Sequence, residues 1–447
     1  MKLSFQNIGK VAKADIEIDA ITVITGANDT GKSTVGKLLY GIYTTLNQLN
    51  PSYLLQNKYE SVLDDFHLLR RRTMRIEDQE EELREFLQLL RERLLEFWDL
   101  ESFVNENSII ESEIKLDLLI KYIVKSVKSF LEDAENSGNK PTGIESILED
   151  MLEKSNIKSS NEDSQRLLLE NVLLEEFSGS FTTELKSKPD ADIHFIEDRE
   201  NFLELALRHN KVIKETSHIS RKRDFYHVFY IDNPFILDNL DRQRISHFRE
   251  RKRYNHIDSL VKLLSIKEDK NFFEEAMLEK NISNILSSVI KGSIKTSQSG
   301  YKYYEKGLSE PISIKSISTG MKSFALLQLL MDYGHLNKRS EMLILDEPEI
   351  HLHPDWQLKY AEFIVLLAKE YQLRVLITSH STDFIEAIDL YSQIHNINDG
   401  VRFYKTQSVS HNMSEIINVT DNLEPLYKDM IRPIEIFEKL EEELDER

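Results

Sequence analysis

The octapeptide GANDTGKS at residues 26–33 is the feature that most constrains how this chain folds. It follows the β-branched run ITVIT, residues 21–25, which is typical of a strand buried on both faces. It precedes a segment in which apolar residues recur at helical spacing over 35–46. A glycine-rich loop between a buried strand and an amphipathic helix predicts an α/β fold with a phosphate-binding loop at the helix N-terminus.

The pattern G-x-x-x-x-G-K-[S/T] gives each part of this loop a role. Backbone N–H groups cradle phosphates, Lys32 reaches the β- and γ-phosphates, and Ser33 ligates Mg²⁺. We therefore expect ATP and Mg²⁺ as ligands. The residues predicted to bind the nucleotide are Gly26, Ala27, Asn28, Asp29, Thr30, Gly31, Lys32, Ser33 and Thr34.

Composition narrows the classes of function. The chain has 57 Lys+Arg against 77 Asp+Glu, a formal charge of −20, so nucleic acid would have to bind through local basic patches. The absence of cysteine excludes disulfides and thiolate metal sites. No run approaches the roughly 18 apolar residues of a membrane span, and the N-terminal segment has no apolar signal core. We expect a cytoplasmic protein without a membrane partner.

Later segments extend the α/β pattern. The runs MLILD (342–346) and RVLITSH (374–380) are typical of buried strands, and helical patterns separate them, so a parallel sheet is predicted. Residues 47–225 are charged, helical in pattern and poor in glycine. We therefore predict an ATPase domain built from residues 1–46 and 226–447, with a large helical insertion or arm over 47–225.

Two carboxylates follow one of these strands. Asp346 and Glu347 come directly after four apolar residues and before a proline, in MLILDEP. The carboxyl ends of such strands face the ligand crevice, so we expect Asp346 to hold Mg²⁺, directly or through water, together with Ser33. Glu347 is then placed to polarise the attacking water. His380 ends the next strand at the same edge and is predicted to hydrogen-bond a γ-phosphate. With Lys32, Glu347 and His380 form the predicted catalytic set.

The order and spacing of these motifs resemble those of ABC-type ATPases, most closely the RecF/SMC/OLD branch. The stretch SISTGMKS (316–323) stands where that family has a signature of the form LSGGQ or LSxGE. Ser318 falls on its serine, Gly320 on its second glycine and Lys322 on its trailing basic residue, while a threonine replaces its first glycine. The resemblance implies that Ser318 and Gly320 contact ATP bound to a second subunit of a homodimer. The residues alone also fit a simple helix cap.

The sequence HLHPDWQ after Glu347 is similar to the AAA ATPases of bacterial anti-phage systems, including the PtuA ATPase of Septu. This resemblance implies an ATP-hydrolysing dimer that controls a separate nuclease or toxin effector. Residues 381–447 are too few for the TOPRIM nuclease domain of OLD proteins, and we find neither its acidic set nor an H-N-H motif. Two alternatives remain: a RecF/SMC-like repair ATPase that binds DNA, and a nucleotide-gated scaffold that does not hydrolyse ATP.

Some features are assigned less directly. Basic clusters at 68–75 and 242–253 are either solvated helix faces or patches for nucleic acid or a partner protein. The glutamine that couples Mg²⁺ to the insertion in ABC-type ATPases has no clear counterpart; Asp232 sits on a plausible strand, but its residue type differs. Phe5 is the candidate for stacking on adenine.

Overall fold

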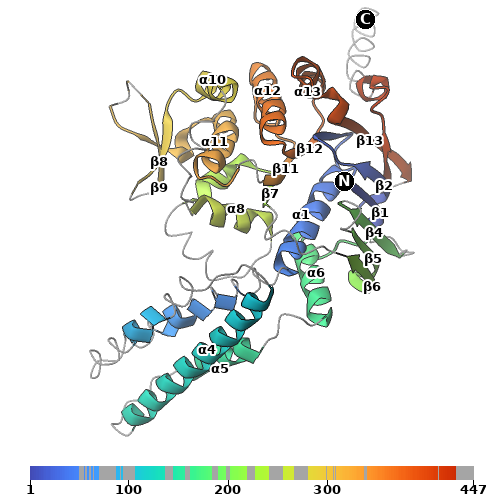
Figure 1. Ribbon diagram of the computed structural model, residues 1–447. Coiled ribbons are helices and arrows are strands. Elements are labelled where there is room, and N and C mark those ends of the chain that lie inside the picture. The colour runs from blue at the N-terminus through green and yellow to red at the C-terminus, as the bar shows by residue number, and fades with distance from the viewer. Residues whose placement is uncertain are drawn as a thin grey trace, which may run out of the picture. The chain divides into compact units, whose positions relative to one another are not determined.

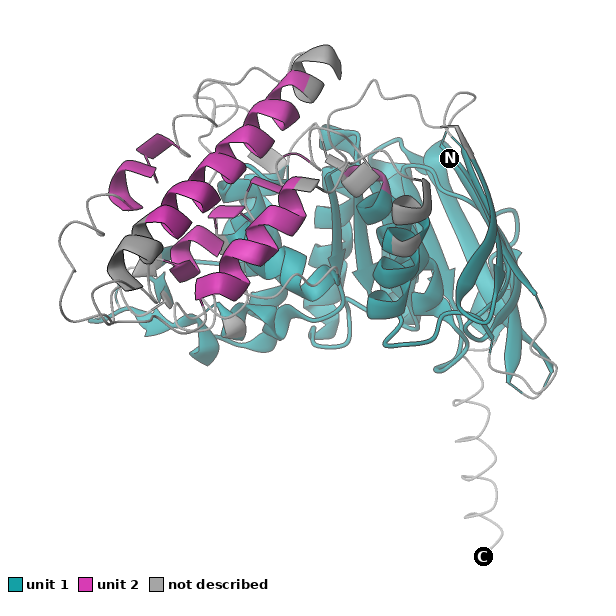
Figure 2. Cartoon of the chain, turned by 90° about the horizontal axis from the view of Figure 1, so that it is seen from below, with its two compact units in different colours: residues 1–45, 166–220, 226–447 teal, residues 46–165, 221–225 magenta. Residues whose placement is uncertain are grey.

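We analysed a computed structural model of the chain. Its described residues are 1–49, 106–135, 144–156, 162–183, 190–197, 202–218, 227–240, 255–265, 280–297, 300–305, 307, 309–336, 340–410 and 412–428, with short stretches between 55 and 93. The chain forms two compact units (Figure 2). Unit 1 comprises residues 1–45, 166–220 and 226–447, and unit 2 comprises residues 46–165 and 221–225.

Unit 1 is organised around an eleven-stranded sheet in the order β6-β5-β4-β1-β2-β14-β13-β3-β12-β11-β7 (Figure 1). Its strands are β1 (Lys2–Ile8), β2 (Val11–Glu17), β3 (Ile21–Thr25), β4 (Ala191–Ile196), β5 (Phe202–Arg208), β6 (Lys211–His218), β7 (His227–Ile231), β11 (Ser340–Asp346), β12 (Arg374–Ser379), β13 (Val401–Ser410) and β14 (Met413–Asn418). A separate three-stranded sheet pairs β8 (Ser293–Ser297), β9 (Gly300–Tyr304) and β10 (Ile312–Ser313).

The centre of the large sheet is parallel, as predicted. Strand β3 lies between β13 and β12, and β11 lies between β12 and β7, with every one of these pairs parallel. The register places Asp346 beside Thr378 and Ser379 beside Thr25. The strand that precedes the glycine-rich loop and the strand that carries the acidic pair therefore end at the same edge of the sheet.

Helices cover both faces of this parallel part. The described helices that lie wholly or partly in unit 1 are α1 (Lys32–Leu49), α6 (Glu162–Glu176), α8 (His256–Ser265), α10 (Lys280–Val289), α11 (Thr319–Asp332), α12 (Pro354–Tyr371) and α13 (Thr382–Ile394), with short 3₁₀ turns η1 (Pro234–Asn239), η2 (Ile314–Ser316) and η3 (Asn398–Gly400). Leu343 and Leu345 of β11 belong to one core cluster with α11, α12 and α13. Ile344 points the other way and lies against α1. Alternation along one buried strand thus packs two helical layers.

Strands β6, β5, β4, β1 and β2 form an antiparallel wing, which β14 joins through a parallel pair with β2, and this wing corrects the predicted insertion of residues 47–225. Strands β4, β5 and β6 pair in sequence next to β1, so residues 166–220 belong to unit 1 and the insertion ends near residue 165. In β4 the side chains alternate between the core and the surface. An alternation with a period of two identifies a strand even where the outward residues are charged. The charged composition of residues 47–225 concealed this alternation in the sequence.

Unit 2 has a helical core of its own. It contains α4 (Glu106–Glu135) and α5 (Ile144–Asn156), and its buried residues Leu116, Ile120, Ile123 and Val127 recur at helical spacing. They cluster with buried residues of α5. The prediction of a helical insertion therefore holds for the described part of residues 46–165.

Gly36 sets how closely α1 approaches the sheet, and it provides a test of this packing. A methyl group at Gly36 would lie 2.9 Å from Ile344 Cγ2. Alanine normally stabilises a helix interior by about 1 kcal/mol over glycine, but here we expect Gly36→Ala to destabilise by about 1–3 kcal/mol because the buried methyl must move. The thermal unfolding midpoint is the measurement.

Gly41→Ala in the same helix is the matched control. Its nearest new contact, at 2.8 Å, is Leu173 Cδ2, the end of a flexible side chain, so the loss should be smaller. A higher midpoint for Gly36→Ala would contradict the close packing of α1 on β11.

Candidate functional site

The loop 26–31 connects β3 to α1 and has an unusual backbone. Gly26, Asp29 and Gly31 have φ angles of 142°, 67° and 86°, a region in which glycine is the least strained residue. A Cβ atom at Gly26 would lie 1.8 Å from Thr406 Oγ1 of the neighbouring strand β13. Thr406 donates to Thr30 Oγ1 at 2.8 Å, and Thr30 in turn donates to the Ala27 carbonyl at 2.8 Å. The sheet therefore holds the loop in shape.

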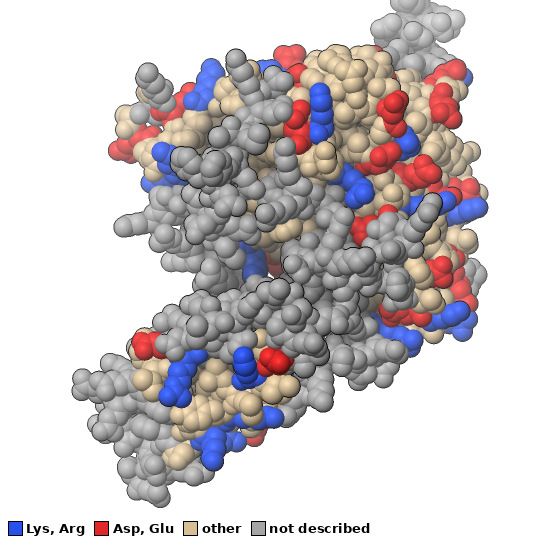
Figure 3. Space-filling view, viewed as in Figure 1, with Lys and Arg blue, Asp and Glu red and all other residues tan. Residues whose placement is uncertain are grey.

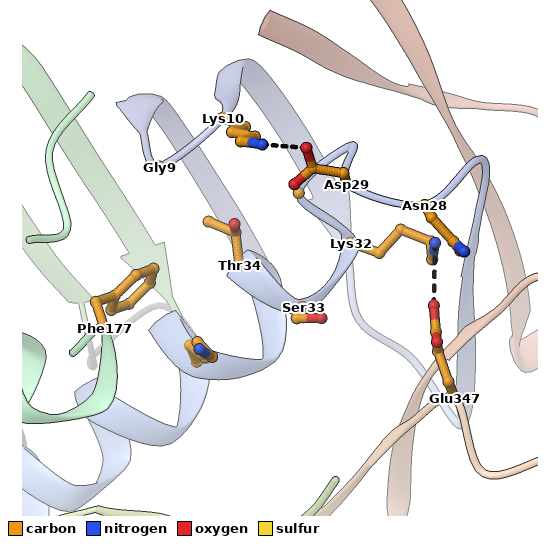
Figure 4. Close-up of a pocket in the computed structure, with 11 residues that line it drawn as sticks. Gly9, Lys10, Asn28, Asp29, Lys32, Ser33, Thr34, Phe177 and Glu347 are labelled. Carbon is orange, nitrogen blue, oxygen red and sulfur yellow. Dashed lines mark hydrogen bonds and ion pairs between the residues drawn. The ribbon is translucent and has the colours of Figure 1, made fainter. Parts of the chain in front are cut away.

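Lys32 begins α1 and points back into the loop (Figure 4). Its Nζ donates to the carbonyl oxygens of Gly26 and Ala27, both at 3.0 Å, and lies 3.2 Å from Glu347 Oε1. The side chain is only 4% exposed, so its charge is balanced by these three oxygen atoms. The structure thus joins the predicted phosphate-binding lysine to the predicted general base.

Asp346 lies at the meeting point of several elements. Its Oδ1 accepts hydrogen bonds from Ser33 Oγ at 3.1 Å and from Thr378 Oγ1, and its Oδ2 accepts one from Tyr230 OH at 3.1 Å. A serine hydroxyl beside a carboxylate is the hard oxygen donor set that Mg²⁺ prefers. The two residues predicted to ligate the metal therefore fit it.

Glu347 has a left-handed backbone with φ of 50°, which is uncommon for a residue other than glycine. Its N–H lies within hydrogen-bonding distance of the Thr378 carbonyl at 3.0 Å and Thr378 Oγ1 at 3.1 Å, and these contacts hold the strained turn. His380 follows β12, and its Nδ1 lies 3.6 Å from Glu347 Oε1. The side chain of His380 is 43% exposed. The structure brings the three predicted catalytic residues into one chain of contacts.

Sequence reasoning missed Glu349, two residues after Glu347. Its side chain is 2% exposed, and its Oε1 accepts hydrogen bonds from Ser379 Oγ at 2.6 Å and from the His380 N–H at 3.0 Å. Burial raises the pKa of the Glu349 carboxyl above its ordinary value. Glu349 fixes the backbone that carries His380, and its position in the run DEPE was the available signal.

A cavity of about 430 Å³ lies beside the loop (Figure 4). The predicted nucleotide-binding residues that line it, together with the predicted base, are Asn28, Asp29, Gly31, Lys32, Ser33, Thr34 and Glu347. Four further lining residues, Gly9, Lys10, Lys37 and Phe177, were not predicted. Asp346 and His380 adjoin this group through Ser33 and Glu347. The volume is in the range of small-ligand sites.

The stretch SISTGMKS separates into buried and exposed residues. Ser318 is exposed and caps α11, because its Oγ accepts a hydrogen bond from the Met321 N–H at 3.3 Å. Gly320 is buried, and a Cβ atom there would lie 2.9 Å from Trp356 Cε3. Lys322 is also buried, with Nζ 2.7 Å from Asp238 Oδ1. The predicted helix cap is present. Of Ser318 and Gly320, which were predicted to contact a second subunit's ATP, Ser318 is exposed and Gly320 is buried.

The less direct assignments have mixed outcomes. The prediction for Phe5 was wrong, because this residue of β1 is only 1% exposed and is unable to stack on a base. The arginines and lysines of the clusters at 68–75 and 242–253 lie outside the described residues. Over unit 1, the face in Figure 3 mixes acidic and basic side chains.

The described helices include none that is long and apolar enough to cross a membrane.

Asp232 is exposed, but it contacts the buried His256 next to the site. His256 stacks on Tyr230 with ring centroids 4.2 Å apart, and Tyr230 bonds to Asp346. His256 Nδ1 lies 2.6 Å from Glu176 Oε1, and its Nε2 lies 3.0 Å from Asp232 Oδ2. Burial alone would lower the pKa of His256, but the hydrogen bonds and charges of the two carboxylates outweigh it and raise the pKa to about 9.

Comparisons with known proteins identify the domain. A family model described as an AAA ATPase domain matches residues 1–385. No curated protein matches the chain.

Several solved structures align at low similarity. An Smc head bound to the C-winged helix domain of ScpA is 12% identical, with 96% of this chain and 98% of that chain covered and a TM-score of 0.39. The SMC head domain from Thermotoga maritima is 12% identical, covers 94% and 98%, and has a TM-score of 0.35. At these scores the alignments add no functional information.

The His256 cluster predicts a pH dependence of stability. A histidine pKa that folding raises from 6.5 to about 9 stabilises the fold fully below pH 6.5, and this contribution is lost as the pH rises through 9. We expect the free energy of unfolding to fall by roughly 3 kcal/mol between these limits. Denaturant titrations across this range measure it.

His256→Gln should flatten this slope, whatever its effect on absolute stability. His194→Gln, at an exposed histidine on β4, is the control and should keep the slope. An unchanged slope in His256→Gln would show that other groups cause it.

Proposed function

The chain belongs to the AAA ATPase domain family, and on this premise we propose that it binds ATP at residues 26–33 and hydrolyses it. One observation carries the proposal. Lys32 contacts Glu347, and Ser33 contacts Asp346, so the first two residues of α1 meet two adjacent residues at the end of β11. This arrangement pairs a phosphate-binding lysine with a base and a metal-binding hydroxyl with a carboxylate.

The phosphates enter at the N-terminus of α1, where backbone N–H groups and the helix dipole favour negative charge. In the structure, the Lys32 ammonium is satisfied by two loop carbonyls and by Glu347. A phosphate oxygen competes for the same ammonium. When Lys32 turns to the phosphate, the Glu347 carboxylate loses its cation and becomes available to accept a proton.

Glu347 then polarises a water molecule whose oxygen attacks the γ-phosphorus. The bond from the γ-phosphorus to the β–γ bridging oxygen breaks, ADP leaves with that electron pair, and Glu347 accepts the water proton. His380 donates a hydrogen bond to a γ-phosphate oxygen, with its backbone held by Glu349. Ser33 and Asp346 would hold Mg²⁺, and the ion would supply neutralisation of the phosphate charge.

We propose further that the ATPase is of the ABC type and acts as a homodimer. The support is the position of Ser318, which is exposed at the N-terminus of the fourteen-residue helix α11. A second subunit's γ-phosphate would accept a hydrogen bond from this hydroxyl, because the serine already stands where helix N–H groups point outward.

The biological role that fits best is a cytoplasmic ATPase subunit of an anti-phage defence system, as in PtuA of Septu, that controls a separate nuclease or toxin. The support is the tail HLHPDWQ after Glu347. Gln357, at its end, donates to the Leu352 carbonyl at 3.2 Å and accepts from Ser381 Oγ at 2.8 Å, so the tail joins the acidic strand end to the helix after His380. A RecF/SMC-like repair ATPase and a non-hydrolysing scaffold are the competing roles.

Glu347→Gln and Lys32→Ala test the catalytic assignment. We expect Glu347→Gln to retain ATP affinity within a few-fold and to lower kcat by about 100-fold or more, because the base is lost. Lys32→Ala should lose ATP affinity by at least roughly tenfold. Isothermal titration and phosphate-release assays measure the two effects.

The same assays with and without DNA separate the three roles. A DNA-stimulated rate in the purified chain favours the repair ATPase, and negligible turnover favours the scaffold. Full kcat in Glu347→Gln would remove this residue from its role.

Ser318→Arg tests the composite site. We expect it to leave ATP binding to the monomer intact, while it blocks ATP-dependent dimerisation and hydrolysis, because the long cation occupies the partner's phosphate position. Ser316→Arg, two residues earlier and also exposed, is the matched control. Light scattering and phosphate release report the outcome. Persistent hydrolysis in Ser318→Arg would leave the stretch with a capping role alone.

A further inference from the structure

One end of the cavity is not explained by phosphate binding. Gly9, Lys10, Lys37 and Phe177 line the same space of about 430 Å³ as the glycine-rich loop. In Figure 4, Phe177 lies on the far side of Thr34 from Lys32 and Glu347. The cavity therefore runs from a cationic and acidic end to an aromatic end.

The aromatic end is a built wall rather than a loose loop. Phe177 directly follows α6, and its N–H donates to the Leu173 carbonyl at 2.9 Å. The turn after it is bonded to the β1–β2 hairpin. The Gly9 N–H donates to the Phe181 carbonyl at 2.8 Å, and Thr183 Oγ1 donates to the Gly9 carbonyl at 3.1 Å.

Asn210, in the turn between β5 and β6, fixes this wall from the other side. Its Oδ1 accepts hydrogen bonds from the N–H groups of Phe181 and Thr182 at 2.9 and 2.8 Å, and from Thr182 Oγ1 at 2.9 Å. The Asn210 side chain thus accepts the hydrogen bonds of two backbone N–H groups in the segment after Phe177. Because the wall is ordered before a ligand arrives, binding to it costs little conformational entropy.

The two phenylalanines of this segment have different roles. Phe181 is fully buried and fills the core. Phe177 is only half-buried, lines the cavity, and has the Lys37 ammonium 5.8 Å from its ring centroid. A π-face beside a cation suits a ligand that is aromatic and carries negative charge.

We propose that Phe177 is the stacking platform for the purine ring of the nucleotide, with Lys37 beside it. This inference rests on the proposed function, because the phosphates at residues 26–33 anchor the ligand whose base reaches Phe177. Thr34 and Gly9 then lie along the sugar, between the two ends. A Cβ atom at Gly9 would come 3.3 Å from Thr34 Oγ1, so glycine keeps this passage wide.

Inorganic tripolyphosphate separates the two ends of the site, because it has the phosphates of ATP without the base. Dissociation constants of ATP and tripolyphosphate are measured by isothermal titration for the wild type and for Phe177→Ala. We expect Phe177→Ala to weaken ATP about 10- to 100-fold, the usual size of base stacking on an aromatic residue, and to leave tripolyphosphate unchanged. Phe177→Trp should restore ATP affinity.

Phe235→Ala is the matched control, because the ring of Phe235 is accessible and has a lysine ammonium, that of Lys322, 5.0 Å from its centroid, as Phe177 has Lys37. It should bind both ligands like the wild type. Equal weakening of ATP and tripolyphosphate in Phe177→Ala, unchanged ATP affinity, or no rescue by Phe177→Trp would each overturn the stacking role. Failure of the wild type to bind either ligand would overturn the proposed function itself.

Discussion

The carboxylate of Asp346 is the interaction on which the rest of the site depends. A carboxylate that is partly removed from water is costly unless donors surround it. Here the donors are Ser33 from α1, Thr378 from β12 and Tyr230 from β7, while Asp346 itself ends β11. Four elements must therefore stay in one register for this group to remain satisfied. The same register places Glu347 at Lys32 and His380 at Glu347, so the geometry of the candidate site follows from satisfying one partly buried charge.

The site also concentrates positive charge in an acidic protein. The chain carries a formal charge of −20, yet three lysines, Lys10, Lys32 and Lys37, line one cavity. Lys10 pairs with Asp29, and Lys32 pairs with Glu347. These carboxylates act as internal counterions that a polyphosphate can replace. When a polyphosphate binds, the lysines exchange a carboxylate partner for a phosphate partner. A protein whose net charge repels anions can therefore still bind an anion at this cavity.

The sequence predicted those parts of the site that local patterns encode. The loop 26–33, the acidic pair and His380 each follow a buried apolar run, and parallel pairing of those runs is enough to bring their ends together. Phe177 was not predictable in this way. Its segment is held at the cavity by hydrogen bonds to Gly9 in the β1–β2 hairpin and to Asn210 in the β5–β6 turn, which are contacts between distant parts of the sequence. Glu349 was visible in the run DEPE, but only its burial reveals that it supports His380.

The stretch SISTGMKS illustrates why a motif match must be tested residue by residue. Gly320 is explained by its contact with Trp356, where any side chain would collide, and Lys322 is explained by its buried ion pair with Asp238. Neither needs a second molecule to account for its residue type. Ser318 caps a helix, which threonine, aspartate or asparagine would do as well. Ser318 is thus the residue of this stretch that is both exposed and able to bond to a partner's phosphate. The dimer proposal depends on this one hydroxyl.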